Sequence, residues 1–307
     1  MSFCILTYAS AVAQYESDSL FSFAMYQDVK VTFNFPNNFL KNKQTILILY
    51  ALPNGNTTEQ TMGKKLEPGD DWHFDIQHIR AQTDFIRENL PNQNIVVGYL
   101  ENNLKSWPAW KQKHGEYVSM IGHIVDTLYE MIPSGKKVLY LNGHSGGGSF
   151  IFGFLTDIDK IPSYIKRISF LDSDYNYDSS YFKKLEHWLL HVKHSHLTVF
   201  AYNDSVALYN DKPVVSATGG TWYRSHRMMD DFSGNFIFQK TREDSIITYE
   251  TADKQIGFFF KNNPNRGIYH TQQVELNGFI HSILFGTEKD SQGYLYYGKR
   301  AYSRYIK

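Results

Sequence analysis

The sequence predicts an α/β protein whose mostly parallel β-sheet is covered by helices on both faces. Continuous apolar runs at residues 45–52 (TILILYAL) and 95–100 are typical of parallel strands buried on both sides. Amphipathic segments alternate with these runs, as in repeated β-α-β units with right-handed crossovers. With 307 residues, of which 42% are hydrophobic, the chain can bury the core of one such domain. We therefore expect a single domain over residues 14–307.

The other expected elements keep the same alternation. Residues 29–35 alternate apolar and polar side chains and are expected to form an edge or half-buried strand. Residues 210–253 are polar, interrupt the alternation and are expected to form a long lid-like excursion, with a hairpin of 246–249 and 256–260 beside it. Further strands are expected at 137–142, 168–171 and 197–202, and helices at 72–90, 117–132, 149–155, 181–192 and 276–284.

A serine motif lies between an expected strand and an expected helix. Its sequence, Gly143-His144-Ser145-Gly146-Gly147, has the form G-x-S-x-G in the strand-turn-helix context of a nucleophile elbow. The serine would stand at the carboxyl edge of the sheet and at a helix N-terminus, where backbone N–H groups point outward. We expect Ser145 to be a catalytic nucleophile. The alternative is a glycine-rich turn used only for packing or for binding phosphate.

An oxyanion hole would complete such a site. The N–H group of Gly146 is expected to stabilise the oxyanion of a tetrahedral intermediate. A second donor is expected from the loop that follows the strand at 45–52, which begins Pro53-Asn54-Gly55. Either Asn54 or Gly55 is the candidate, through its backbone N–H group. An ordinary Asn-Gly turn is the alternative interpretation of this dipeptide.

Five segments together resemble a group of exported bacterial α/β-hydrolases. They are ALPNGNTTEQT (51–61), DWHFDIQHIRAQ (71–82), SWPAWKQKH (106–114), NGHSGGGSFIFGFL (142–155) and FLDSDYNY (170–177). The resemblance implies the α/β-hydrolase fold and a catalytic triad in the chain order serine, acid, histidine. It implies no particular substrate, because the fold hosts esterases, lipases, peptidases and amidases alike.

Three carboxylates compete for the role of the triad acid. Asp172 directly follows the strand at 168–171, Asp174 lies two residues further on, and Asp204 follows the strand at 197–202. Most α/β-hydrolases place the acid after the second strand beyond the nucleophile, which favours Asp204, whereas a minority use the first. The Leu-Asp-x-x-Tyr pattern at 171–175 resembles exported hydrolases of that minority. We prefer Asp172 and keep Asp204 and Asp174 as alternatives.

Two late histidines compete for the role of the base. His270 lies in a segment expected to be a loop before the last helix, which is the usual place of a catalytic histidine. His281 lies within that helix, about 140° from Leu276 at ~100° per residue, and is expected to face away from the apolar stripe. We prefer His270, held by Asp172, and keep His281 as the alternative.

Composition limits the partners. Lys+Arg and Asp+Glu number 31 each, which argues against a nucleic-acid partner. Cys4 is the only cysteine, so the chain can form no internal disulfide and no cysteine zinc site. His73 and His78 are five residues apart rather than at the i, i+4 spacing of helical zinc ligands, and are expected on a polar helix face. We expect neither a metal nor a cofactor.

The first residues resemble an export signal. Residues 2–13 form a short apolar run that ends in Ala11-Val12-Ala13, a pattern that suits signal peptidase, although no Lys or Arg follows Met1. The run is too short to anchor the protein in a bilayer. We expect a signal peptide over residues 1–13 and export to the periplasm or the outside of a bacterial cell. A buried N-terminal strand or helix is the alternative.

These features predict a serine hydrolase that works through an acyl-enzyme intermediate. We expect a carboxylic-ester hydrolase, with a small ester or an acylated carbohydrate as substrate; aromatic residues, at 16%, are numerous enough to line such a pocket. A peptidase or amidase with the same triad is one alternative. A non-catalytic binding protein that kept the fold is the other.

Overall fold

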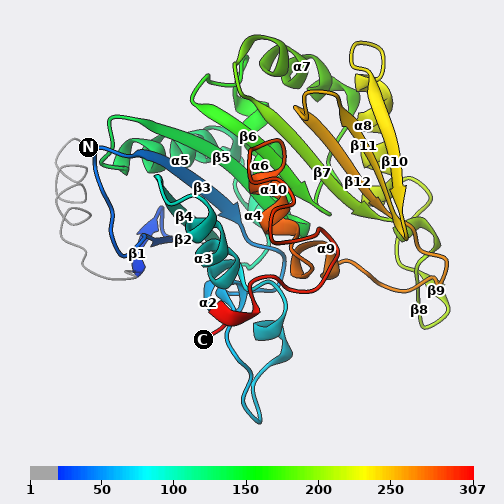
Figure 1. Ribbon diagram of the computed structural model, residues 1–307, viewed down its shortest axis with the longest axis horizontal. Coiled ribbons are helices and arrows are strands. Elements are labelled where there is room, and N and C mark those ends of the chain that lie inside the picture. The colour runs from blue at the N-terminus through cyan, green and yellow to red at the C-terminus, as the bar shows by residue number, and fades with distance from the viewer. Residues whose placement is uncertain (1–19) are drawn as a thin grey trace.

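A ten-stranded sheet forms the centre of the molecule (Figure 1). The computed structural model describes residues 20–307, so the expected signal peptide at 1–13 lies outside the described residues. The strands lie in the order β1-β2-β4-β3-β5-β6-β7-β12-β11-β10. Their bounds are β1 Leu20–Met25, β2 Val29–Asn34, β3 Gln44–Ala51, β4 Gln93–Asn102, β5 Lys137–His144, β6 Ile165–Leu171, β7 His196–Tyr202, β10 Phe238–Glu243, β11 Ile246–Thr251 and β12 Ile256–Lys261.

The six central strands, from β4 to β12 in this order, are mutually parallel. Antiparallel pairs extend the sheet at both edges, with β1 and β2 on one side and β11 and β10 on the other. The expected strand at 45–52 is the central strand β3, and its side chains are buried on both faces as a parallel strand requires. The sequence prediction of a mostly parallel sheet is confirmed. The fold is that of the α/β-hydrolases.

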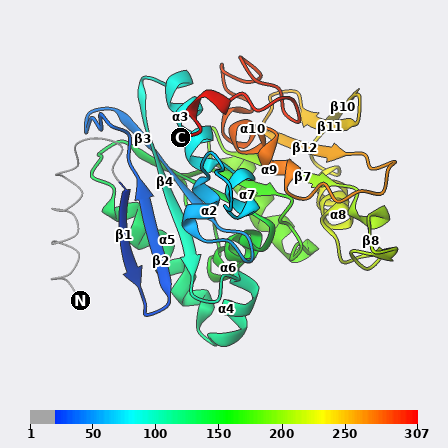
Figure 2. The ribbon, with the colours of Figure 1, turned by 90° about the horizontal axis from the view of Figure 1, so that it is seen from below.

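Helices cover both faces of the sheet and enclose two hydrophobic clusters (Figure 2). On one face lie α4 (Trp107–Lys113), α5 (Tyr117–Met131), α6 (Gly148–Asp157), α7 (Phe182–His191) and α8 (Thr221–Phe232). On the other lie α2 (Thr58–Met62), α3 (Ile79–Asn89), α9 (Gln272–Glu275) and α10 (Gly278–Leu284). Within residues 20–307, none of the helices has the length and the apolar composition needed to cross a membrane.

Two segments differ from their expected form. The single helix expected at 72–90 is divided into a short 3-10 turn, η1 (Trp72–Asp75), and helix α3. The break falls at His78, whose φ of 45° is left-handed and cannot continue a right-handed helix. His78 is fully buried and contacts Asp75 Oδ1 at 2.7 Å through its Nε2, so it is not on a polar helix face.

The expected lid-like excursion at 210–253 belongs mostly to the body of the fold. Only the short hairpin of β8 (Leu208–Tyr209) and β9 (Lys212–Pro213) stands apart from the main sheet. Helix α8 packs on β7 and β12, and β10 and β11 extend the sheet beyond β12. The expected hairpin is confirmed as β11 and β12. Part of the polar composition comes from β10, an exposed edge strand that carries polar side chains rather than a core face.

Buried Gln82 joins the helices on one face of the sheet. Its Nε2 donates to the carbonyl oxygens of Gln77, at 2.7 Å, and Val274, at 3.0 Å. Its Oε1 accepts from the backbone N–H of Ile280 at 3.2 Å. One side chain from α3 therefore satisfies backbone groups of α9 and α10, the two helices that follow the loop containing His270.

We predict that Gln82→Leu lowers the free energy of unfolding by at least about 2 kcal/mol, because buried backbone groups lose their partners. Chemical denaturation followed by circular dichroism measures the change. The same substitution at Gln239, exposed on the edge strand β10, serves as the control and is expected to change stability by less than about 0.5 kcal/mol. Equal effects of the two substitutions would contradict the prediction.

Candidate active site

Ser145 occupies a strained turn between β5 and α6. Its φ is 55°, a left-handed value that a residue with a side chain adopts rarely and at a cost in energy. Its neighbours His144 and Gly146 are buried, whereas Ser145 itself is half-buried. The parallel strands β5, β6, β7 and β12 all end at this edge of the sheet. The turn therefore presents the serine at the edge where ligands of open α/β sheets bind.

The glycines after Ser145 are required by close approach of the backbone. A Cβ atom on Gly147 would lie 2.1 Å from the carbonyl oxygen of Ala51, at the end of β3. A Cβ atom on Gly148 would lie 1.8 Å from the carbonyl oxygen of Ser173, in the loop after β6. The elbow thus packs directly against the end of β3 and the loop that follows β6.

The structure brings Asp172 and His270 together. Asp172 follows β6 with a φ of 48°, is fully buried, and donates its backbone N–H to the carbonyl oxygen of Phe200 at 2.8 Å. Its Oδ2 contacts Nδ1 of His270, which lies in the loop between β12 and α9. With Nδ1 donating to a carboxylate, Nε2 of His270 is the nitrogen free to take a proton. This is the relation that an acid and a base have in a hydrolase triad.

His144 links the serine turn to the histidine loop. Its Nε2 donates to the carbonyl oxygen of His270 at 3.2 Å, and the two imidazole rings lie with their centroids 4.5 Å apart. Burial, and then repulsion from His270 when both rings are protonated, holds the pKa of His144 well below its usual range. His144, the residue before Ser145, is therefore hydrogen-bonded to His270, which in turn contacts Asp172.

Asp204 caps a helix instead of holding a histidine. Its Oδ2 accepts the backbone N–H of Thr221 at 2.8 Å and its Oδ1 that of Trp222 at 3.4 Å, so it lies at the N-terminus of α8. Burial, and then the charge of Asp172, raises the pKa of Asp204 to about 6. A helix N-terminus is a favourable site for a carboxylate, which accounts for its position.

Asp174 also lies apart from His270. Its Oδ2 accepts from Ser225 Oγ at 2.8 Å, and burial raises its pKa well above the usual range. Its Oδ1 is buried without a hydrogen-bond partner. The three competing carboxylates are thus neighbours, and among them Asp172 is the one in contact with a histidine.

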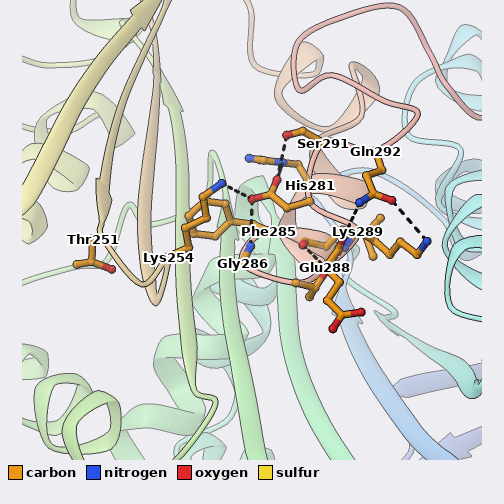
Figure 3. Close-up of polar contacts among 12 residues, drawn as sticks. Thr251, Lys254, His281, Phe285, Gly286, Glu288, Lys289, Ser291 and Gln292 are labelled. Carbon is orange, nitrogen blue, oxygen red and sulfur yellow. Dashed lines mark hydrogen bonds and ion pairs between the residues drawn. The ribbon is translucent and has the colours of Figure 1, made fainter.

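His281 is buried, in contrast to the expected outward-facing position. Its Nδ1 contacts the hydroxyl of Tyr294 at 3.0 Å and lies 3.9 Å from Oδ1 of Asp290. In Figure 3 its side chain lies beside those of Lys254 and Ser291. The C-terminal segment after α10 covers the face of the helix that its own periodicity marks as outward. Burial lowers the pKa of His281 to about 4.

A cavity of about 240 Å³ lies next to His281, between β11 and the C-terminal segment. The residues that line it include Lys254 and Asp290, which are joined by an ion pair at 2.8 Å. They include neither Ser145 nor His270. His281 therefore belongs to a structural cluster of its own, whereas His270 contacts His144, the residue before Ser145.

The two candidates for the second oxyanion donor differ in their contacts. The backbone N–H of Gly55 donates to the carbonyl oxygen of Lys105 at 2.8 Å, so the expectation that it serves as a donor is not supported. Its φ of +84° explains the glycine, because the turn needs a left-handed residue there. Asn54 lies directly beside the elbow: a Cβ atom on Gly146 would come within 2.0 Å of Asn54 Oδ1. Of the two candidates, Asn54 is therefore the one that lies next to Gly146, the first expected oxyanion donor.

Sequence reasoning missed Thr221. It is fully buried at the start of α8, and its Oγ1 contacts Oδ1 of Asp172. The residue lies in the segment expected to be an excursion. Gly219-Gly220 followed by a helical run was the available signal for a helix start, because glycine is accepted before the first helical residue. A Cβ atom on Gly220 would lie 2.2 Å from Asp204 Oδ2, which explains the second glycine.

The chain matches no known protein-family model, and no curated protein matches it. Several solved structures resemble it. Siderophore hydrolase EstA from Aspergillus nidulans is 10% identical, with a TM-score of 0.47 over 89% of this chain and 96% of that one. A feruloyl esterase module from Clostridium thermocellum is 10% identical, with a TM-score of 0.49 over 90% and 91%. Acetyl xylan esterase from Aspergillus awamori is 12% identical, with a TM-score of 0.43 over 80% and 92%. Likenesses this distant assign no activity.

We predict that Gly148→Ala lowers the free energy of unfolding by about 3 kcal/mol, because its Cβ atom has no room beside the Ser173 carbonyl. Thermal or chemical unfolding measures the loss. Gly135→Ala is the matched control, since nothing lies within 4 Å of a Cβ atom at that position and its φ is not left-handed. A Gly148→Ala variant as stable as the Gly135→Ala variant would contradict this packing.

We predict that Asp204→Asn removes a dependence of stability on pH. The pKa of Asp204 is raised from 3.8 to about 6, so between these values the folded state holds a proton that the unfolded state has released. The stabilising contribution is complete below about pH 4 and is lost as pH rises through about 6. Relative to the Asp204→Asn variant, the wild type should lose up to about 3 kcal/mol over that range.

Denaturation curves of both proteins between about pH 4 and pH 8 measure the difference. Parallel pH dependences of the two proteins would contradict the assignment of a raised pKa to this carboxyl group.

Proposed function

We propose that this protein is a serine hydrolase that cleaves carboxylic esters through an acyl-enzyme intermediate. Ser145 attacks the acyl carbonyl carbon while Nε2 of His270 takes the hydroxyl proton. Asp172 keeps the proton of His270 on Nδ1 and stabilises the imidazolium that forms. The backbone N–H groups of Gly146 and Asn54 receive the developing negative charge. His270 then protonates the leaving alcohol, and water releases the acyl group by the same steps.

The observation that carries the proposal is the contact of Asp172 with His270 at the edge of the sheet where Ser145 stands. His144 bonds the serine turn to the backbone of that same histidine. The strained φ of Ser145 adds support, because strain persists where the surrounding structure requires one conformation. A chain that kept the fold only as a binding scaffold would have no need of all three features.

Esters are the substrate class to which the proposal commits. An alcohol leaves more easily than an amine, and His270 is the single acid that the triad supplies to protonate the leaving group. Small esters and acylated carbohydrates are the expected substrates. We also propose export from a bacterial cell, which rests on the apolar run that ends at Ala13 and on the resemblance of the sequence motifs. A peptidase or amidase is the alternative activity.

We predict that a fluorophosphonate probe labels the wild-type protein and fails to label Ser145→Ala. Labelling is detected by intact-protein mass spectrometry. Ser149→Ala, four residues further on in α6, is the control and should label as the wild type does. A wild type that is not labelled, or a Ser145→Ala variant that is labelled equally, would refute the proposed enzyme. The alternative of a non-catalytic binding protein would then remain.

Chromogenic substrates then distinguish the two activities. A series of p-nitrophenyl esters is expected to be hydrolysed faster than aminoacyl p-nitroanilides of matched acyl groups, and Ser145→Ala is expected to hydrolyse neither. Faster cleavage of the anilides would mean that the protein is an amidase with the same triad and not an esterase.

A further inference from the structure

Both oxygens of the buried Asp172 carboxylate have a side-chain partner. Oδ2 contacts Nδ1 of His270, and Oδ1 accepts the hydroxyl proton of Thr221. Asp172 and Thr221 are both fully buried. Among the described residues, His270 is the one basic side chain within 4 Å of the Asp172 carboxylate. The Thr221 hydroxyl therefore supplies the other side-chain hydrogen bond that this buried charge requires.

The position of Thr221 is itself closely determined. Its backbone N–H donates to Oδ2 of Asp204 at 2.8 Å, and its hydroxyl oxygen lies 3.3 Å from that same oxygen. The hydroxyl carries one proton, and Asp172 Oδ1 is the closer of its two carboxylate acceptors. Helix α8 is held against the sheet by stacking of His226 on Phe260, with ring centroids 4.2 Å apart. The donor is thus mounted on a rigid element rather than on a loop.

A second hydroxyl one turn along α8 makes a comparable bond to a different carboxylate. Ser225 Oγ donates to Oδ2 of Asp174 at 2.8 Å, and Ser225 is as buried as Thr221. Asp174 contacts no histidine among the residues that the structure describes. The bond of Thr221 to Asp172 and the bond of Ser225 to Asp174 therefore differ in whether the carboxylate contacts His270. This difference separates an effect on the triad from an effect on the stability of α8.

We propose that Thr221 is a positioning residue of the active site: its hydroxyl fixes the plane of the Asp172 carboxylate and thereby the orientation of His270. The inference rests on the proposed function. A carboxylate held at one oxygen can rotate about its Cβ–Cγ bond, whereas a second hydrogen bond at the other oxygen stops the rotation. Hydrogen bonds to charged groups are the stronger ones in proteins, so the loss of this bond affects orientation and charge together.

The test compares Thr221→Val, Thr221→Ser and Ser225→Ala in ester hydrolysis. Valine keeps the shape of threonine and removes the hydroxyl, and we expect kcat to fall about 10- to 100-fold with KM little changed. Serine keeps the hydroxyl, and we expect it to recover most of the lost kcat. Ser225→Ala removes the neighbouring bond of α8, and we expect kcat to stay within about twofold of the wild type.

A spectroscopic measurement tests the same bond without catalysis. The low-field proton NMR signal of His270 Nδ1–H, identified by its absence in His270→Gln, is expected to shift or broaden in Thr221→Val and to remain unchanged in Ser225→Ala. Thermal unfolding of each variant shows whether it is folded. Unchanged kcat and an unchanged signal in a folded Thr221→Val protein would overturn the proposal, as would an equal loss of kcat in Ser225→Ala.

The outcomes also separate this proposal from the function on which it rests. A wild type that fails to react with the fluorophosphonate probe refutes the hydrolase. In that case the His270 signal in Thr221→Val still decides whether Thr221 restrains the Asp172–His270 pair. If the wild type reacts with the probe and Thr221→Val keeps the kcat and the His270 signal of the wild type, only the positioning role is refuted.

Discussion

The buried carboxylate of Asp172 is the constraint on which the rest of the site depends. A fully buried charge is costly unless hydrogen bonds compensate it. The compensation comes from distant parts of the chain: His270 from the loop after β12, and Thr221 from the start of α8. The backbone N–H of Asp172 bonds to β7. One carboxylate thus determines how the end of β6, helix α8 and the histidine loop are placed relative to one another.

The same charge affects the ionisable groups around it. Burial raises the pKa of Asp204, Asp174 and Tyr175, and the charge of Asp172 adds to each of these shifts. A carboxyl group whose pKa is raised by folding stays protonated, and therefore uncharged, up to a higher pH than in the unfolded chain. The neighbours of Asp172 contribute hydrogen bonds and helix capping around the carboxylate that contacts His270.

The extension of the sheet by β10 and β11 is connected to the site through helix α8. Helix α8 lies in the connection between β7 and that extension, and its N-terminus must reach the carboxyl edge to place Thr221 beside Asp172. Stacking of its His226 on Phe260 of β12 keeps it there. At the other side of the site, the elbow packs against the end of β3 and the loop after β6, and this contact leaves no space for side chains at Gly147 and Gly148. The site therefore depends on backbone packing as much as on the contacts of its side chains.

Local patterns in the sequence were sufficient for the fold and for the elbow. Apolar runs of strand length mark parallel strands because both faces of such strands are covered, and glycines around Ser145 mark a turn that admits no side chain. The acid at the end of β6 could be proposed in the same way. The structure of the polar segment 210–253 could not be predicted, because the polarity of an exposed edge strand and that of a loop are alike in composition.

The partners within the site were decided by tertiary structure. Asp172 and Asp204 each follow a parallel strand. Their surroundings become different only in the folded chain, where the N-terminus of α8 binds Asp204 and the hydroxyl of Thr221 binds Asp172. His281 has the helical phase of a solvent-facing residue, yet the C-terminal segment folds over it and leaves His270 at the serine turn. The sequence by itself determined where Ser145 stands, since a strand-turn-helix is local. Long-range packing decided which carboxylate and which histidine meet there, because residues about 100 positions apart come together only in the folded chain.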